Sequence, residues 1–276
     1  MSIKAKAMSI REKINNISKE QKVPYQNIEK SFLIERLLSR ITSNANLFKK
    51  LIFKGGYVGL RVYDSKRYTV DLDAIVKNAN LESTLSQIQD IVETEESDAV
   101  WFALEKTVDL QTQGEYGGTR QVYRAGIGEK LKNISKASVV HFDVGAGDPV
   151  IPISVKTKSL LSNELISWQV YPIETIIAEK IHAFIARDGE SSRAKDIYDL
   201  SFYLPKANKE KLIKSLNECF QFRETKKPES FAKKMSSFSF SLTKSGWPKA
   251  VSSLGHNVSF DKSLEVVLSS LKKINI

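Results

Sequence analysis

Apolar residues in the first 50 positions recur at spacings of three and four, the period of an amphipathic α-helix. Charged residues stand between them, so the pattern predicts a helix with one face toward a core. Pro24 separates this helix from an earlier, more basic one around residues 10–17. The apolar series is Ile28, Phe32, Leu33, Ile34, Leu37, Leu38 and Ile41, and the charged residues between them are Glu29, Lys30, Glu35, Arg36 and Arg40.

The period changes after residue 50, where short apolar segments replace the helical pattern. Residues 81–95 return to it and predict a helix, whereas residues 100–125, with the break EYGGTR, predict a hairpin. The remaining short segments predict strands and a turn. These segments are LIFKGG (51–56), YVGLRVY (57–63), RYTVDLDAIV (67–76) and ASVVHFDVGAG (137–147).

The chain becomes mainly helical from Pro172 onward and ends in an amphipathic stretch at Leu264–Leu271. The expected strands stop near residues 160–172. We therefore expect an α+β protein: a mixed core with N-terminal helices in residues 1–165, followed by a helical C-terminal domain in residues 166–276.

Composition narrows the possible functions. A net charge of +10 and a pI near 9.4 favour polyanionic partners, above all nucleic acid, although a generally basic protein that binds none is the alternative. The single cysteine, Cys219, excludes an internal disulfide and argues against a structural zinc site. The N-terminus lacks the apolar core of a secretory signal, and no apolar run is long enough to span a bilayer. A reducing cytosol is the expected location.

The segment Asp71-Leu72-Asp73 is the first candidate for chemistry. In a strand, alternate residues face the same side, so the two carboxylates project together. Two carboxylates on one face repel each other unless a cation lies between them, and Mg²⁺ prefers oxygen ligands and substrate phosphates. The alternative is an edge strand with two solvated acids.

The segment Lys54-Gly55-Gly56 precedes these acids. Glycine allows a sharp turn and a close approach of backbone to ligand, and successive N–H groups in such a turn can hold a phosphate. Alone, the pair indicates an ordinary turn. A glycine turn followed by Asp71 and Asp73 supplies both halves of a nucleotide–Mg²⁺ site, and this combination favours the site.

A third acid is expected if two metal ions hold the reacting phosphate. Asp143 is the candidate, because it alternates with apolar neighbours and shares a face with His141. Asp148 is a poorer choice in the following loop. The alternative for Asp143 is an acid that flanks a turn.

The helical half contributes a second cluster. Lys180 lies within an apolar stripe, so it needs an anionic partner: a nucleotide phosphate, or else a buried carboxylate or a side chain that reaches solvent. Asp196 and Asp199 are three residues apart and are neighbours on a helix. Asp196 could pair with Lys180 or hold the acceptor hydroxyl; a solvated helix start is the alternative. The stripe comprises Ile173, Ile176, Ile177, Lys180, Ile181 and Phe184.

The order of KGG and DLD, followed far downstream by AEK and RAKDIYDL, resembles the AbiEii/AbiGii-type nucleotidyltransferase toxins over about residues 10–205. The resemblance implies a polymerase-β-like core, a mixed sheet flanked by helices, and a helical C-terminal domain that contributes to the active site. It also implies a toxin with a cognate antitoxin, a role in phage defence and, in some relatives, nucleotide transfer to the 3′ end of tRNA.

By position, the resemblance assigns the triphosphate to Gly55, Gly56 and Lys180, the Mg²⁺ or Mn²⁺ ions to Asp71 and Asp73, and completion of the site to Asp196. Many nucleotidyltransferases carry Gly-Ser in the turn, whereas Tyr57 follows Gly-Gly in this chain, so backbone N–H groups must serve there. The expected nucleotide-binding residues are Lys54, Gly55, Gly56, Arg61 and Lys180, with Arg67 a further candidate, and the expected metal ligands are Asp71, Asp73 and Asp143.

The expected reaction is attack of an acceptor hydroxyl on the α-phosphorus of an NTP, with release of pyrophosphate. RNA is the expected acceptor. A small molecule or protein acceptor could use the same residues, and a non-catalytic RNA-binding module that kept the fold is the third alternative.

Overall fold

A computed structural model describes residues 2–110, 118–145, 149–189, 193–254 and 257–274. The chain divides into two compact units. The first unit comprises Met1–Val62, Tyr68–Gly147 and Pro152–Val170, and the second comprises Tyr63–Arg67, Asp148–Ile151 and Tyr171–Ile276. Asp148 and positions 115–117 of the expected hairpin break lie outside the described residues.

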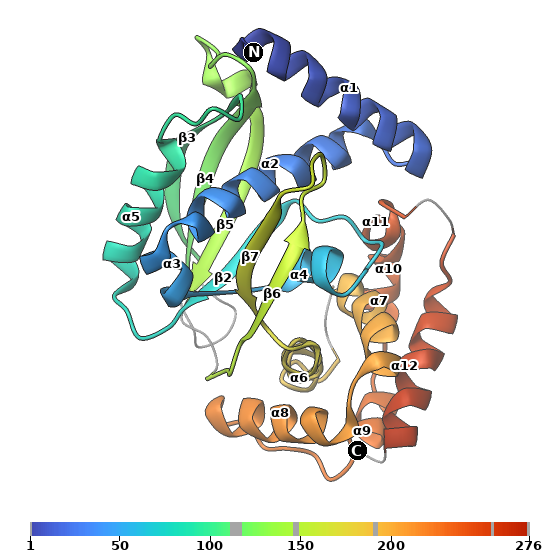
Figure 1. Ribbon diagram of the computed structural model, residues 1–276. Coiled ribbons are helices and arrows are strands. Elements are labelled where there is room, and N and C mark those ends of the chain that lie inside the picture. The colour runs from blue at the N-terminus through green and yellow to red at the C-terminus, as the bar shows by residue number, and fades with distance from the viewer. Residues whose placement is uncertain (1, 111–117, 146–148, 190–192, 255–256, 275–276) are drawn as a thin grey trace. The chain divides into compact units, whose positions relative to one another are not determined.

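The first unit is built on a mixed seven-stranded sheet in the order β3-β4-β5-β2-β1-β7-β6 (Figure 1). The pairs β2–β5 and β1–β7 are parallel, and the other neighbours are antiparallel. This confirms the expected α+β class with a mixed sheet and flanking helices. The strands are β1 (Leu51–Lys54), β2 (Asp71–Val76), β3 (Val100–Leu110), β4 (Gly118–Ile127), β5 (Ser138–Gly145), β6 (Ile153–Lys158) and β7 (Leu165–Val170).

The described residues of this unit form five α-helices and a short 3₁₀ helix. Helix α2 crosses one face of the sheet and contacts β5 and β7 (Figure 1). Asparagine side chains cap the N-termini of two of these α-helices: Asn44 accepts hydrogen bonds from the first turn of α3, and Asn80 accepts one from Ser83 in α5. The helices are α1 (Ile3–Gln21), α2 (Tyr25–Ser43), α3 (Ala45–Lys50), α4 (Gly55–Val62), α5 (Leu81–Glu93) and η1 (Ile134–Lys136).

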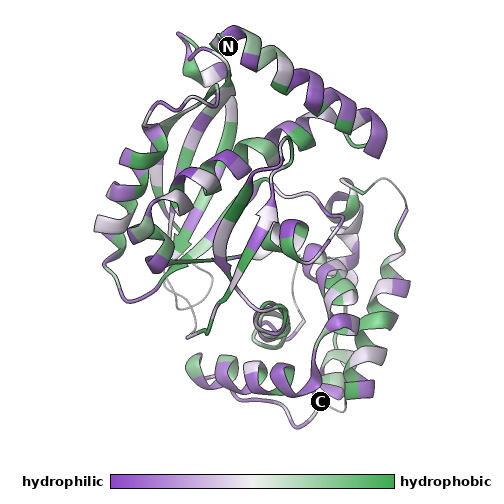
Figure 2. Cartoon of the chain, in the orientation of Figure 1, coloured by the Kyte–Doolittle hydropathy of each residue, from purple (hydrophilic) through white to green (hydrophobic). Residues whose placement is uncertain are grey.

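The core of the first unit lies between the sheet and α2. Phe53, Phe142 and Trp168 from three strands meet there, with Phe53 and Phe142 stacked at 6.3 Å and Phe53 edge-on to Trp168 at 5.7 Å. Tyr57, fully buried, packs against Trp168 and donates a hydrogen bond from its hydroxyl to the Ser31 carbonyl oxygen. Figure 2 shows that the central strands are rich in hydrophobic residues.

The structure corrects three expectations. Residues 57–63 were expected as a strand, but residues 57–62 belong to α4, because a short apolar run does not distinguish a buried helix from a strand. Strands β6 and β7 were not expected, although both alternate apolar and polar residues, β6 over residues 153–156 and β7 over residues 166–170; the sequence argument assigned no element to these short segments. The charged residues Glu35, Arg36 and Arg40, expected between the apolar positions, are buried.

The second unit is helical. Its packing is dominated by α6 against α8 and by α12 against α7 and α9. Rings of Phe240, Phe260 and Trp247 make edge-on and tilted contacts in its core. None of the helices in the described parts of the chain is long and apolar enough to cross a membrane. The helices are α6 (Ile173–Ile185), α7 (Ala194–Tyr203), η2 (Leu204–Lys206), α8 (Lys209–Phe222), α9 (Phe231–Ser236), α10 (Ser241–Ser245), α11 (Trp247–Val251) and α12 (Phe260–Ile274).

Candidate active site

A row of charged residues crosses four neighbouring strands of the sheet. In the strand register, Lys54 of β1 pairs with Asp73 of β2, Asp73 pairs with Asp143 of β5, and Asp143 pairs with Arg120 of β4. Directly paired residues share a face of a sheet, so the four side chains form one row with a cation at each end and two acids in the middle. Asp71 and His141 form the neighbouring pair on the same face.

The glycine turn lies against the second acid of the DLD segment. Gly55 has φ +74°, and a Cβ atom built there would lie 2.0 Å from Asp73 Oδ2. Only glycine therefore allows both the left-handed backbone and the close approach of the carboxylate. Gly55 is also the first residue of α4. The positive end of a helix dipole thus lies beside Asp73, where it favours an anion or a phosphate.

The other DLD acid has a histidine partner. Asp71 Oδ1 lies 2.8 Å from His141 Nδ1, and both side chains are about 30% exposed (30% and 29%). The alternation expected from the sequence is present: Leu72 and Ala74 are buried, whereas Asp71 and Asp73 lie on the opposite, more open face. Solvent and small ligands therefore have access to the Asp71 carboxylate.

Asp143 is held by an arginine that the sequence argument did not assign to it. Arg120 donates two hydrogen bonds to the Asp143 carboxylate, from Nε and Nη2, each at 2.7 Å. The pKa of Arg120 is raised, first by the hydrogen bond to Asp143 and further by the charges of Asp143, Asp71 and Asp73, although burial opposes the shift. Arg120 therefore lies in the combined negative field of the three acids.

The oxygen chemistry of Asp71 and Asp73 suits Mg²⁺, and their alternate positions aim both carboxylates to one side. Asp143 is adjacent in register, but both of its oxygens are bonded to Arg120. Among the described residues, no group of three or more His, Cys, Asp or Glu side chains is gathered closely enough to hold a metal ion. The donor set fits a metal bound by two acids, and Asp143 would have to leave Arg120 to join it.

Helix α4 is anchored by a buried carboxylate. Glu35 of α2 is 1% exposed and accepts hydrogen bonds from Arg61 at 2.9 Å, from the Ser159 hydroxyl at 2.6 Å and from the Leu160 N–H. Burial raises the pKa of Glu35, and the charge of Arg61 acts against that rise. Arg61 also donates to the Lys158 carbonyl oxygen. Arg61 is thus occupied in supporting the helix that begins at Gly55, and its expected nucleotide contact stays a prediction.

The second cluster lies within the second unit. The Lys180 ammonium donates to Asp196 at 2.5 Å and to Asp199 at 2.8 Å, and all three side chains are at most 14% exposed. Asp199 also accepts two hydrogen bonds from Arg67 at 3.0 and 2.8 Å. The Lys180–Asp196 pair was one of the arrangements that the sequence allowed. Arg67, a further candidate for triphosphate binding, is paired with this buried carboxylate, and its nucleotide contact stays a prediction.

These ion pairs shift the pKa of each member toward its charged form. Burial lowers the pKa of Lys180, but Asp196 and Asp199 outweigh it and raise that pKa above its ordinary value. Burial likewise opposes ionisation of Asp199, yet Lys180 and Arg67 hold its pKa at about 2. The cluster is therefore charged at neutral pH and holds α6 against α7.

Four members of these clusters were missed or given other roles: Arg120, His141, Glu35 and Asp199. Strand alternation does place Arg120 and Asp143 on exposed faces of their strands, but it does not reveal which strands are neighbours. The position of Glu35 three residues after Phe32 looks like the edge of an amphipathic helix, and only the arrangement of Arg61 and Ser159 shows that it is buried.

Comparison with known proteins agrees with this architecture. Residues 36–258 match the family model described as "Nucleotidyl transferase AbiEii toxin, Type IV TA system". The crystal structure of JHP933 from Helicobacter pylori superposes with a TM-score of 0.55 at 15% identity, covering 91% of this chain and 93% of that one. An H. pylori protein proposed to be a nucleotidyltransferase gives 0.54 at 15% identity, covering 91% and 96%. A search among curated sequences gives no match.

Proposed function

Because the chain belongs to the AbiEii nucleotidyltransferase toxin family of type IV toxin–antitoxin systems, we propose that it transfers a nucleotide from an NTP to RNA, with the 3′ end of tRNA as acceptor. The observation that carries this proposal is the contact of the Gly55 turn with Asp73. A phosphate-binding helix start and a metal-binding carboxylate must be adjacent if one triphosphate is to contact both.

Mg²⁺ or Mn²⁺ is the proposed cofactor, and Asp71 and Asp73 are its proposed ligands. When bound, the ion neutralises phosphate charge and lowers the pKa of the attacking hydroxyl. Asp143 is the proposed third ligand. Its double hydrogen bond to Arg120 means that this role requires the carboxylate to rotate away from the guanidinium group.

The chain's own groups bind and orient the triphosphate in this proposal. The N–H groups at Gly55 and Gly56 and the Lys54 ammonium bind the phosphate oxygens, and Asp71 and Asp73 fix the reacting end. The acceptor hydroxyl attacks the α-phosphorus, the new P–O bond forms, and the bond to the β-phosphate oxygen breaks to release pyrophosphate. Catalysis then comes mainly from positioning and charge neutralisation.

Lys180 and Asp196 are assigned to the same reaction on the family resemblance, Lys180 for the triphosphate and Asp196 to complete the site. Their ion pair supports a fixed, charged lysine at neutral pH. A purely structural role predicts that Lys180→Arg changes stability alone. The proposed role predicts that it also raises the KM for NTP under conditions in which circular dichroism shows the variant to be fully folded.

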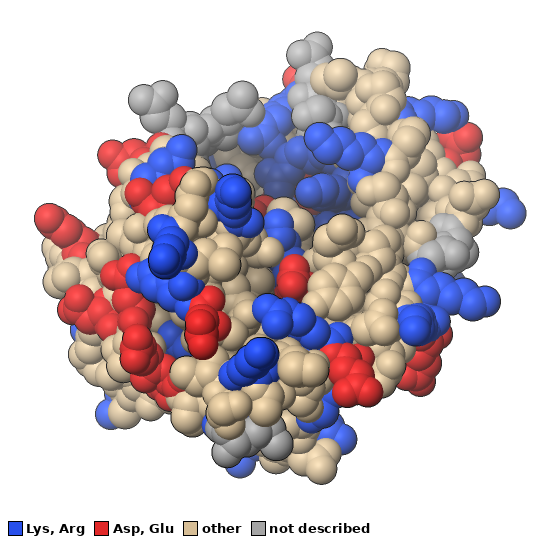
Figure 3. Space-filling model, turned by 90° about the horizontal axis from the view of Figure 1, so that it is seen from above, with Lys and Arg blue, Asp and Glu red and all other residues tan. Residues whose placement is uncertain are grey.

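RNA is preferred as acceptor because the chain carries a net charge of +10. Figure 3 shows Lys and Arg side chains gathered in groups on one face, with Asp and Glu between them. A small-molecule acceptor needs no such surface. The toxin family also implies a cognate antitoxin protein as partner. The cytoplasm, where tRNA is found, is the proposed location.

The experiment is incubation of the purified protein with each labelled NTP, Mg²⁺ or Mn²⁺, and total tRNA, in parallel with a panel of proteins and small acceptors. We expect label on tRNA. Asp71→Asn and Asp73→Asn should abolish transfer, whereas Asp109→Asn, an exposed acid on β3, should not. Label on a small molecule or protein would show that RNA is not the acceptor. RNA binding without any incorporation of label would favour the non-catalytic RNA-binding module.

A further inference from the structure

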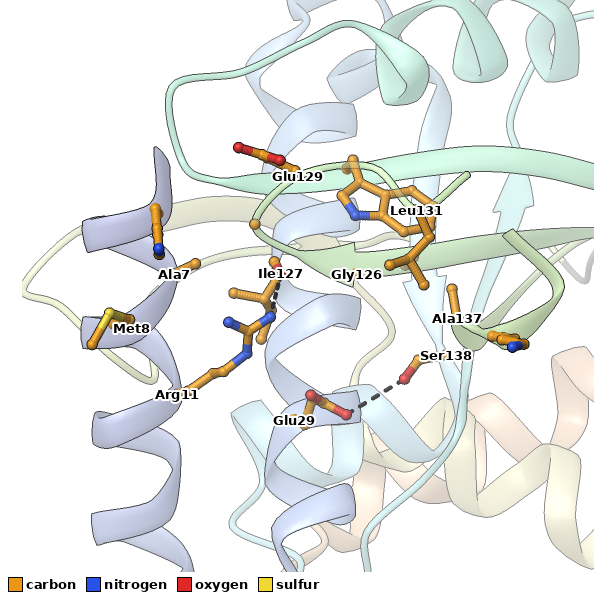
Figure 4. A pocket seen from close by; sticks show the side chains of 15 residues that line it. Ala7, Met8, Arg11, Glu29, Gly126, Ile127, Glu129, Leu131, Ala137 and Ser138 are labelled. Atoms are coloured by element: carbon orange, nitrogen blue, oxygen red, sulfur yellow. Dashed lines mark hydrogen bonds between the residues drawn. The ribbon is translucent and has the colours of Figure 1, made fainter. Parts of the chain in front are cut away.

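A cavity of about 570 Å³ lies at the end of the sheet where β4 ends and β5 begins, a volume suited to a small ligand or one unit of a polymer (Figure 4). It belongs entirely to the first unit. Helix α1 contributes Lys4, Met8 and Arg11, strand β3 contributes Trp101, and the segment after β4 contributes Leu131 and Lys136. Residues assigned to the transfer reaction do not line it.

Specific contacts build this cavity. A Cβ at Gly126 would lie 2.8 Å from the Trp101 ring, so glycine lets the indole lie directly on the β4 backbone. Gly128 has φ +98°, and a Cβ there would lie 3.3 Å from the Ala7 Cβ, which brings α1 close to the sheet. Arg11 donates to the Ile127 carbonyl oxygen at 2.6 Å and holds the helix in that position (Figure 4).

The lining combines three kinds of group. Met8 and Leu131 are apolar yet 63% and 45% exposed, so together with Trp101 they offer surface that a flat ring would cover. Lys4 and Lys136 are exposed cations at the cavity. Glu29, which also accepts a hydrogen bond from Ser138, supplies carboxylate oxygens that can accept N–H groups from a base edge. The apolar surface suits the base, the cations suit the phosphates and the carboxylate acceptors suit the base edge, so the lining as a whole suits one nucleotide.

A strip along β4 connects this cavity with the acidic row. Arg120, Arg124 and Gly126 alternate along the strand and therefore share a face, on which Arg120 meets Asp143 and Gly126 meets Trp101. Gly126 lies six residue steps along the strand from Arg120, a distance of about 20 Å. An RNA strand whose 3′ end lies at the acids could reach the cavity within a few nucleotides.

We propose that the cavity holds one nucleotide of the RNA acceptor, on the 5′ side of the reacting hydroxyl, with the base against Met8, Leu131 and Trp101 and its phosphates near Lys4 and Lys136. This inference rests on the proposed function for its choice of RNA. A free nucleotide offers the same base and phosphate as a nucleotide within RNA, so the experiment tests both ligands.

The test measures the affinity of a fluorescent single-stranded RNA by anisotropy in EDTA, without NTP, and therefore independently of catalysis. K4E/K136E should weaken binding roughly tenfold and reduce the slope of log K against log salt by about 1.4, since each phosphate contact on a single strand contributes about 0.7. K19E/K77E is the control: it changes the net charge by the same amount at two exposed lysines outside the cavity, and its salt slope should match that of the wild-type protein. Ala137→Trp should weaken binding by filling the cavity.

Equal losses of affinity and slope in the two double variants would overturn the proposal, because a general positive field would then explain binding. In the transfer assay, K4E/K136E should raise the KM for RNA and leave kcat unchanged. If AMP or GMP displaces the RNA from the wild-type protein but not from K4E/K136E, the cavity also binds a free nucleotide, which supports a nucleotide site there. Cavity-dependent RNA binding without transfer would refute the proposed enzyme but not the nucleotide site.

Discussion

Replacing Gly55 with alanine tests the contact on which the proposed site depends. The added Cβ would lie 2.0 Å from Asp73 Oδ2, whereas ordinary van der Waals contact begins at 3.4 Å, so the carboxylate must move by about 1.4 Å. The backbone at φ +74° adds strain of about 1–2 kcal/mol for any residue with a Cβ. Because a carboxylate side chain rotates readily, we expect this backbone strain to account for most of the lost stability.

The expected loss of activity is larger than the loss of stability. A displacement of about 1 Å in a positioning group costs roughly 100-fold in rate, so Gly55→Ala should lower kcat/KM for NTP about 100-fold while the protein stays folded. The assay combines urea unfolding with initial rates of label transfer at several NTP concentrations. Calorimetric titration with a non-hydrolysable NTP and Mn²⁺ separates lost binding from lost chemistry.

Gly128→Ala is the matched control. Its backbone has φ +98°, so it carries a similar conformational cost, but the new Cβ would meet Ala7 at 3.3 Å rather than an acid. We expect similar destabilisation with unchanged NTP affinity. If Gly55→Ala transfers label at the wild-type rate, or if both variants lose NTP affinity equally, the reasoning from the Asp73 contact is wrong.

Three further predictions follow from paired charges and burial. Arg120→Gln removes the counter-ion of Asp143, so it should lower Tm in EDTA and tighten Mn²⁺ binding measured by calorimetry; unchanged Mn²⁺ affinity would contradict this. Lys180→Met removes the cation shared by Asp196 and Asp199, which then keep only their other arginine partners, and should cost about 3–5 kcal/mol in urea unfolding; a loss below about 1 kcal/mol would contradict the ion-pair account. Burial lowers the pKa of His182 to about 4 from 6.5, so the folded protein favours the neutral ring. The free energy of unfolding should therefore be highest above pH 6.5 and fall by up to about 3 kcal/mol as the pH drops toward 4. His182→Gln should flatten this pH dependence in urea unfolding.

The acidic half of the candidate site was predictable from the sequence because it depends on strand alternation. Asp71 and Asp73 lie two residues apart on one strand, and any strand places such residues on one face. The glycine turn was also predictable, since Gly-Gly between apolar segments marks a bend. That Gly55 contacts Asp73 was not, because it depends on the antiparallel pairing of β1 with β2 and on the helix that begins at the turn.

The ion pairs were beyond prediction for a different reason. A periodic pattern reports which side of an element a residue occupies, but a buried charge is stable only through a partner that is distant in sequence. Arg120 and Asp143 are 23 residues apart, and Glu35 and Ser159 are 124 apart. The sequence pattern therefore placed Glu35 only among the charged residues of a helix, whereas the structure makes it the centre of a hydrogen-bond network.

That network gives a physical reason for a buried carboxylate so near the proposed phosphate-binding turn. Removing one partner from a buried ion pair costs several kcal/mol, so Glu35 and Arg61 resist separation. Gly55 is the first residue of α4, and Arg61 lies in its last turn. The Glu35–Arg61 pair therefore fixes one end of the helix, while Tyr57 fixes the first turn through its hydrogen bond to Ser31. A helix held at these two points keeps its N-terminus directed toward Asp73. Under the proposed function, triphosphate would bind without ordering the turn at the moment of binding, which would lower the entropic cost of reaching the reactive geometry.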